Sequence, residues 1–271
     1  KANPELILVP QKKISERTLS AVSTWNQRIS EIDNQLKLSP EPADQNLLLI
    51  SKALFVYELG RVNESIEIFK SVKLLTGAPR LLDEYVNYYL GKIYLSQNLL
   101  REAKLEFNQI LDLSPNGKMQ LETEFLLAQI ALREKNYKMA RQWLTKLEKK
   151  QRRQEGYDEI LYSLAFSEKA LHNTGPFCKW IKKLYTSYPA FERIQDWGPH
   201  LDDDKFEGQP TRCSVTNEDR RKRIKALQWS GQNEKAYKEI ETLRAAVKGE
   251  EKFQVDRLEV SFWLHDGEVE K

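Results

Sequence analysis

Residues 87–115 constrain the fold of this 271-residue chain most, because they predict a pair of packed antiparallel helices. The residues that carry the prediction are Asn87, Leu90, Gly91 and Tyr94 in a first helix, and Ala103, Phe107 and Pro115 in and after a second. Side chains three and four residues apart share one helix face, so the first group forms one contact surface. Gly91 permits close approach of the second helix, Phe107 fills the space between the helices, and Pro115 ends the second helix.

The same pattern recurs at a nearly constant period on both sides of this stretch. Ala53, Ala128 and Ala165 occupy the position of Gly91 in successive units, and the steps between units are 38, 37 and 37 residues. The second-helix contact residues recur with them: Ser65, Phe69 and Val72 in the first unit, Ala140, Leu144 and Leu147 in the third, and Phe177, Ile181 and Leu184 in the fourth. Helix pairs of this size cannot bury their apolar faces alone, so the four units are expected to stack.

This spacing resembles the tetratricopeptide (TPR) repeat family over residues 44–189. Two departures are Asn87, where that family usually has tryptophan, and Ala131, which stands at the position of Tyr94 one repeat later. The resemblance implies that the first helix of each pair lines a concave surface. The predicted fold class is all-α: a right-handed α-solenoid of TPR-like antiparallel helix pairs, interrupted by a long irregular loop.

Four segments make up the predicted domain organisation. Residues 1–43 form an N-terminal arm and a capping helix, and residues 44–189 form four TPR-like helix pairs. The pattern fails over residues 190–217, where glycines, prolines and three consecutive aspartates predict the irregular loop. Residues 218–271 form a degenerate fifth pair and the first helix of an incomplete sixth. An unpaired last helix indicates a parent protein that continues beyond Lys271.

Charge and composition argue against several classes of function. The chain has 43 Lys and Arg residues against 40 Asp and Glu residues, and this near neutrality gives no case for nucleic-acid binding. No run of about 18 apolar residues is present, so no membrane span is expected. The three histidines lack zinc-ligand spacing, and no phosphate-binding loop, dinucleotide motif or nucleophile elbow occurs. We therefore expect no catalytic residue, no metal site and no cofactor in these residues.

The two cysteines, Cys178 and Cys213, leave two interpretations open. In an oxidising compartment, a disulfide between them would fasten the irregular loop to the solenoid and close about 35 residues. In a cytosolic protein they would be two unrelated buried thiols.

A second resemblance concerns the same region. The residues that carry it are Cys178-Lys179-Trp180 through Tyr185, Tyr188-Pro189, Gln195-Asp196-Trp197-Gly198, Cys213 and residues 223–231. They are similar to the N-terminal helical superhelix of soluble lytic transglycosylases from predatory and related bacteria. Those periplasmic enzymes cleave peptidoglycan with a lysozyme-like C-terminal domain, which uses one glutamate as acid and base. The resemblance implies a periplasmic location, a disulfide between the two cysteines, and peptidoglycan or an envelope protein as a partner.

The catalytic part of such an enzyme is not found in this chain. Glu64-Ser65 resembles the catalytic Glu-Ser pair of that family, but the glycine-rich sequence that should follow it is absent. Ser65 is also explained as the small contact residue of the first repeat. Glu64 is therefore not expected to be catalytic.

The predicted partner-binding surface follows the first helices. Ile50, Tyr88, Phe125 and Tyr162 recur at the repeat period and are expected to form a column on the concave face, Leu54, Lys92, Gln129 and Phe166 form the adjacent row, and Tyr57, Tyr85 and Lys169 lie near it. Aromatic side chains dominate many protein interfaces, which favours a protein or peptide partner. The alternative is that these side chains pack within the superhelix. The clamp that many TPR co-chaperones use for a C-terminal carboxylate is not evident, because Ile50 and Leu54 occupy two of its sites.

The sequence thus predicts a non-catalytic protein-interaction scaffold. The first interpretation is the periplasmic superhelical domain of a peptidoglycan lytic transglycosylase or of a cell-envelope assembly protein. The alternative is a cytosolic TPR adaptor that binds a partner peptide in its concave groove. The oxidation state of Cys178 and Cys213 distinguishes the two.

Overall fold

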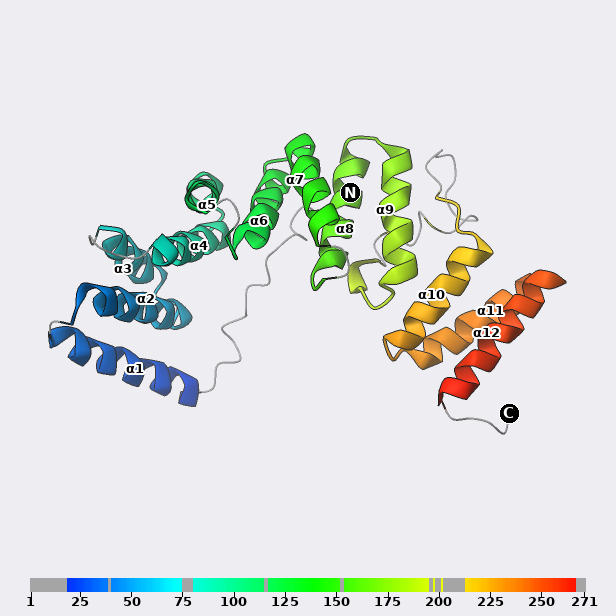
Figure 1. Cartoon of the computed structure of the whole chain (residues 1–271), viewed down its shortest axis with the longest axis horizontal. Helices are drawn as coiled ribbons and strands as arrows, with labels where there is room; N and C mark the ends of the chain where they lie inside the picture. Colours follow the sequence, from blue (N-terminus) through cyan, green and yellow to red (C-terminus); the bar gives the residue numbers. More distant parts are fainter. Residues whose placement is uncertain are drawn as a thin grey trace. The chain divides into compact units, whose positions relative to one another are not determined.

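The structure, a computed structural model, describes residues 19–38, 40–74, 80–114, 117–151, 154–194, 197, 201 and 213–266 (Figure 1). These residues form twelve helices and contain no strand: α1 (Leu19–Lys37), α2 (Pro42–Glu58), α3 (Val62–Leu74), α4 (Arg80–Ser96), α5 (Leu100–Leu113), α6 (Gln120–Arg133), α7 (Tyr137–Lys150), α8 (Tyr157–Ala170), α9 (Thr174–Ser187), α10 (Asn217–Trp229), α11 (Asn233–Ala246) and α12 (Glu250–Asp266). The predicted all-α fold of successive helix pairs is confirmed. Among the described helices, none has the length and apolar character that crossing a membrane requires.

The chain divides into two compact units, residues 1–136 and residues 137–271. Helices α1 to α6 belong to the first unit, and α7 to α12 belong to the second. Each unit has its own cluster of buried apolar side chains. The right-handed sense of the predicted superhelix stays a prediction. The predicted N-terminal arm and most of the predicted loop lie outside the described residues.

In the first unit, neighbouring helices approach each other closely at small residues. Helix α2 packs on α3, and α4 packs on α5. Phe107 of α5 is fully buried, and a Cβ atom built on Gly91 of α4 would lie 2.5 Å from its Cε1 atom. The predicted role of Gly91 is therefore confirmed, because any larger residue would collide with the Phe107 ring. Ser65 of α3 is also fully buried, and its hydroxyl donates a hydrogen bond of 2.8 Å to the carbonyl oxygen of Ala53 in α2.

The contact between Gly91 and Phe107 makes a substitution prediction. Gly91→Ala should lower the free energy of unfolding of the first unit by up to about 2 kcal/mol, because overpacking costs about 1–3 kcal/mol and the better helix propensity of alanine offsets about 1 kcal/mol. Urea unfolding followed by circular dichroism measures this loss. Adding Phe107→Leu should relieve the collision, so the double variant should lose less than the sum of the two single losses. Strictly additive losses would show that the two residues do not press on each other.

The second unit continues the succession of packed helices. Contacts run from α7 to α8, from α8 to α9, from α9 to α10, and onward to α11 and α12. After α9 the chain makes a short 3₁₀ turn at residues 192–194. The described residues that follow it, Trp197 and Leu201, are buried. At these positions the segment predicted as an irregular loop therefore contributes side chains to the core of the second unit.

Candidate functional site

The predicted partner-binding residues of the first unit differ in exposure. Ile50, Tyr88 and Gln129 are buried, with at most 8% of each residue exposed, whereas Leu54, Tyr57, Lys92 and Phe125 are half-buried and Tyr85 is exposed. A side chain inside the core offers no area to a partner. Only the second group can therefore supply contact area directly.

Tyr88 of α4 is held by a small polar network. Its hydroxyl donates a hydrogen bond to the carboxylate of Glu122 in α6, and the Lys92 ammonium donates one of 3.1 Å to the same hydroxyl oxygen. Its ring meets the ring of Tyr89 edge to face, with centroids 5.3 Å apart. Burial, and after it the hydrogen bond to Glu122, raises the pKa of Tyr88 well above its usual range. Tyr88 thus links α4 to α6. This contact fits the alternative stated for the sequence, in which the predicted column of side chains packs within the superhelix and does not face a partner.

Tyr162 of α8 lies under a cover of aromatic side chains in the second unit. The rings of Phe191 and Trp197 each lie 5.6 Å from its ring centroid. The guanidinium carbon of Arg193 lies 3.8 Å from the same centroid, on the ring face. The three covering residues follow α9 and belong to no helix pair. In the sequence, Trp197 falls in the segment predicted as an irregular loop and carries part of the second resemblance, and no core contact is predicted for it. An aromatic residue inside a polar loop is itself a signal of burial, and Trp197 is buried.

The remaining two predicted residues of α8 are accessible. Phe166 is half-buried, and its ring lies 6.1 Å from that of Tyr137. Lys169 is exposed, and its ammonium lies 4.6 Å from the ring centroid of Trp197. We call the predicted residues that are not buried the accessible first-helix set: Leu54, Tyr57, Tyr85, Lys92 and Phe125 in the first unit, and Phe166 and Lys169 in the second.

A pocket of about 510 Å³ in the second unit was not anticipated. Asp158 and Glu159 line it from the start of α8, Tyr188, Phe191, Glu192 and Arg193 from the segment after α9, and Ala226 and Ser230 from the end of α10 and just after it. The Arg193 guanidinium pairs with Glu159 at 2.9 Å. Burial raises the pKa of Glu159, although Arg193 opposes the rise. Carboxylates outnumber the single guanidinium in this lining, so the pocket suits a cationic group.

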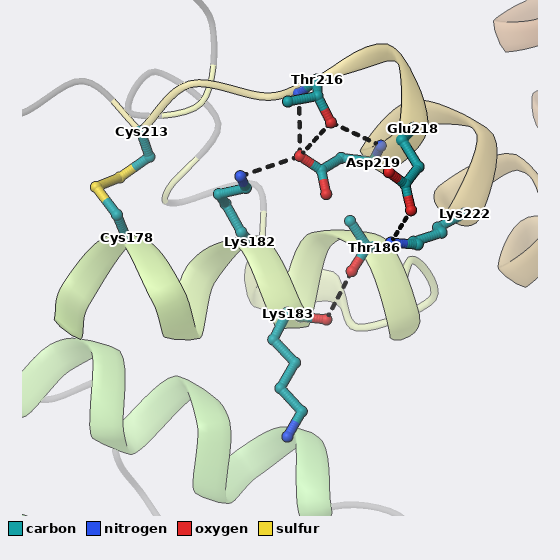
Figure 2. Close-up of polar contacts among 9 residues, drawn as sticks. All are labelled: Cys178, Lys182, Lys183, Thr186, Cys213, Thr216, Glu218, Asp219 and Lys222. Carbon is teal, nitrogen blue, oxygen red and sulfur yellow. Dashed lines mark hydrogen bonds and ion pairs between the residues drawn. A yellow bond between two sulfur atoms is a disulfide. The ribbon is translucent and has the colours of Figure 1, made fainter. Parts of the chain in front are cut away.

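A disulfide joins Cys178 of α9 to Cys213, just before α10, so the pairing implied by the second resemblance is present (Figure 2). Beside it, the Thr216 hydroxyl accepts a hydrogen bond of 3.1 Å from the Asp219 backbone N–H, and the Thr216 N–H donates one of 3.0 Å to the Asp219 carboxylate. This reciprocal cap begins α10. The Lys182 ammonium of α9 pairs with the same carboxylate at 3.0 Å. One covalent bond and one ion pair thus fix the start of α10 on α9.

The charge balance of Asp219 follows from these contacts. Burial alone would raise the pKa of this carboxyl group. Hydrogen bonds from the Thr216 backbone, Lys182 and the Thr216 hydroxyl outweigh burial and hold the pKa of Asp219 below its usual range. The carboxylate is therefore ionised wherever the pH is near neutral, and the ion pair to Lys182 is retained there.

The structure gives Glu64 an ordinary surface position. Its carboxylate pairs with Arg61 three residues earlier, at 2.6 Å, and both side chains are exposed. In the part of the chain that the structure describes, no group of three or more His, Cys, Asp or Glu residues could hold a metal ion.

Comparisons with known proteins give information on the fold of this chain. No family model matches the chain, and no curated protein matches its sequence. Among solved structures, BtubC (BKLC) from P. vanneervenii has a TM-score of 0.50 at 10% identity, covering 90% of this chain and 92% of that one. A tetratricopeptide repeat protein from Parabacteroides merdae has a TM-score of 0.47 at 14% identity, covering 92% and 88%, respectively. PilW, a type IV pilus biogenesis factor, has a TM-score of 0.46 at 15% identity, covering 85% and 90%. At such identities the likeness concerns the fold alone.

Proposed function

We propose that this chain is a non-catalytic scaffold that binds a protein or peptide partner through the members of the accessible first-helix set, taken in each unit by itself. The observation that carries the proposal is the split in exposure along the first helices. Tyr88 and Tyr162 are buried, which fixes the backbone, while Leu54, Phe125 and Phe166 keep apolar area available beside them. Rigid aromatic and aliphatic anchors of this kind lose little entropy when a partner binds.

The disulfide supports an oxidising compartment. Cys213 is 2% exposed, and the bond joins a regular helix to the segment that follows the repeats. Structural disulfides persist in the periplasm and in secreted proteins and are rare in the cytosol. We therefore propose that the chain works in the periplasm, as the superhelical domain of a peptidoglycan lytic transglycosylase or of a cell-envelope assembly protein. Its partner would be an envelope protein or peptidoglycan.

A cytosolic adaptor is the second candidate. Apart from the disulfide, a helix-pair scaffold with half-buried aromatic residues on its first helices fits either compartment. Mass spectrometry of protein purified from its own cells under thiol-trapping conditions separates the two. A mass lower by two hydrogens, with no trapped thiol, supports the periplasmic assignment, and two trapped thiols overturn it.

The proposed binding face can be tested with truncated side chains. The double variant Phe125→Ala/Phe166→Ala should weaken binding of peptides selected from a displayed random library at least about fivefold, because truncating an interface anchor costs more than about 1 kcal/mol. Fluorescence anisotropy with the labelled peptides measures the affinity. The matched control is Leu105→Ala/Met139→Ala, which truncates exposed apolar residues on the second helices α5 and α7. If the two double variants bound the selected peptides with equal affinity, the first helices would not be the binding face.

A further inference from the structure

A groove whose lining includes four basic residues and one acidic residue lies between α10 and α12 in the second unit. Its volume is about 390 Å³. On α10, Arg221, Lys222 and Lys225 face it, and on α12, Arg257 and Leu258 do so. Positions three and four residues apart form one stripe on a helix, so each helix offers a continuous edge to the groove. Leu258 is buried between them and supplies an apolar floor.

The cations of this groove are only partly neutralised. Glu218 pairs with Lys222 at 2.6 Å, a contact that Figure 2 shows at the start of α10. Arg221 pairs with Glu251 at 2.5 Å. Lys225 and Arg257 are exposed, and neither makes an ion pair with any residue in the described part of the chain. The groove therefore presents two uncompensated positive charges from opposite walls.

An exposed tryptophan stands next to these charges. Trp229 is 83% exposed, and it follows Lys225 by one helical turn, so both lie on the same side of α10. On α12, the guanidinium carbon of Arg257 lies 6.0 Å from the ring centroid of exposed Phe253. Tryptophan and arginine are the residues most often found as energetic anchors at protein interfaces. Lys225 and Arg257 thus each have an exposed aromatic residue one turn away on the same helix, beside the groove lining.

We propose that this groove binds an acidic segment of a partner protein. Carboxylates of the segment pair with Lys225 and Arg257, and an apolar side chain packs on Trp229. The inference rests on the proposed function, because α10 and α12 are first helices of successive pairs, and it names the chemistry of the partner. Residues 220–225 form a basic run in the sequence, and the proposal gives this run a specific use.

Charge complementarity favours a peptide over a nucleic acid. Proteins that hold nucleic acids through the phosphate backbone typically make about 6–10 phosphate contacts. The groove offers two uncompensated cations, and the chain as a whole has a net charge of only +3. Two ion pairs and an apolar anchor are instead typical of a short protein segment docked in a groove.

The test uses the full disulfide-bonded chain and two fluorescein-labelled synthetic peptides. One peptide alternates glutamate with leucine, and its twin carries glutamine in place of glutamate. The acidic peptide should bind the wild-type chain at least about tenfold more tightly than the twin does. The double variant Lys225→Glu/Arg257→Glu should lose about tenfold or more in affinity for the acidic peptide, because attraction becomes repulsion at both walls.

A matched control separates a local site from overall charge. Lys235→Glu/Lys238→Glu changes the net charge equally but lies on α11, where both lysines are exposed. It should leave the affinity within about twofold of the wild-type value, because exposed charges beyond about 8 Å are screened at physiological salt. Circular dichroism establishes that each variant is folded, and Lys225→Gln/Arg257→Gln replaces the charge-reversed variant if that one is not. A third variant, Trp229→Ala, should lower the affinity for the acidic peptide by at least about fivefold.

Several outcomes overturn the inference. These are equal losses in the two charge-reversed variants, equal binding of the glutamine twin, and tighter binding of single-stranded oligodeoxythymidine that is lost in Lys225→Glu/Arg257→Glu. Failure of the proposed function has a different signature. If the binding of library-selected peptides depends on Phe125 and Phe166 but not on Lys225 and Arg257, the proposed scaffold function is supported and the proposal of an acidic segment in the basic groove is wrong. If no peptide is selected, both the proposed scaffold function and the proposed groove for an acidic segment are wrong.

Discussion

Replacing Phe107 with alanine should lower the free energy of unfolding of the first unit by about 3–5 kcal/mol. The Phe107 ring is fully buried, and it occupies the space that opposes Gly91 on the neighbouring helix. Removing the ring leaves a cavity that glycine has no side chain to fill. The loss therefore contains both the transfer free energy of the ring and the cost of the cavity.

The measurement must resolve the two units, because a repeat chain need not unfold in one step. Hydrogen exchange of the α4 and α5 amides reports the local free energy of opening, and urea unfolding reports the total. The control is Leu105→Ala, which lies on the same helix with 60% of the residue exposed. It should change the free energy of unfolding by no more than about 0.5 kcal/mol. Equal losses for the two variants would contradict the assignment of Phe107 as the central residue of this helix pair.

The helix pairs could be predicted because the residues that hold each pair together lie close to one another in the sequence. Gly91 and Phe107 are sixteen positions apart in the sequence, and one contact between them explains both residue types. Periodicity then transferred this contact to the weaker copies, where Ser65 and Ala53 make the equivalent close approach through a hydrogen bond. A repeat fold allows such transfer, because each pair meets neighbours of the same kind.

The exposure of the candidate site could not be predicted in the same way. Periodicity indicates that Tyr88 and Tyr162 share a face of the repeat, but it does not indicate what covers that face. In the first unit, Tyr88 is bonded to Glu122 of α6. In the second, Trp197 and Arg193 from outside the repeat cover Tyr162. Burial at equivalent positions thus has different causes, and neither follows the period.

The pocket and the basic groove escaped prediction for a related reason. The pocket is assembled from the start of α8, the segment after α9 and the end of α10, which are widely separated in the sequence. The charged stripe of α10 is visible in the sequence as residues 220–225, but its meaning depends on α12 lying opposite. Sequence spacing describes one helix at a time, whereas both of these sites lie between elements.

Removing the disulfide should produce the second large effect. The double variant Cys178→Ser/Cys213→Ser should lower the free energy of unfolding of the second unit by about 3–4 kcal/mol in the chain-entropy model, because the bond spans 35 residues. Cross-linking restricts the unfolded chain, so the loss should appear without any loss of helix content under native conditions. Urea unfolding with and without a dithiol reductant measures it.

The reductant provides the internal control for this prediction. Reduction should destabilise the wild-type chain by about the same 3–4 kcal/mol and leave the double serine variant unchanged. The ion pair between Lys182 and Asp219 and the Thr216 cap remain in both proteins, so α10 should still begin at its usual position. Hydrogen exchange of α10 should then rise relative to α8 while the helix persists. If reduction leaves the stability of the wild-type chain unchanged, the bond does not constrain this segment, and the argument for an oxidising compartment loses its physical basis.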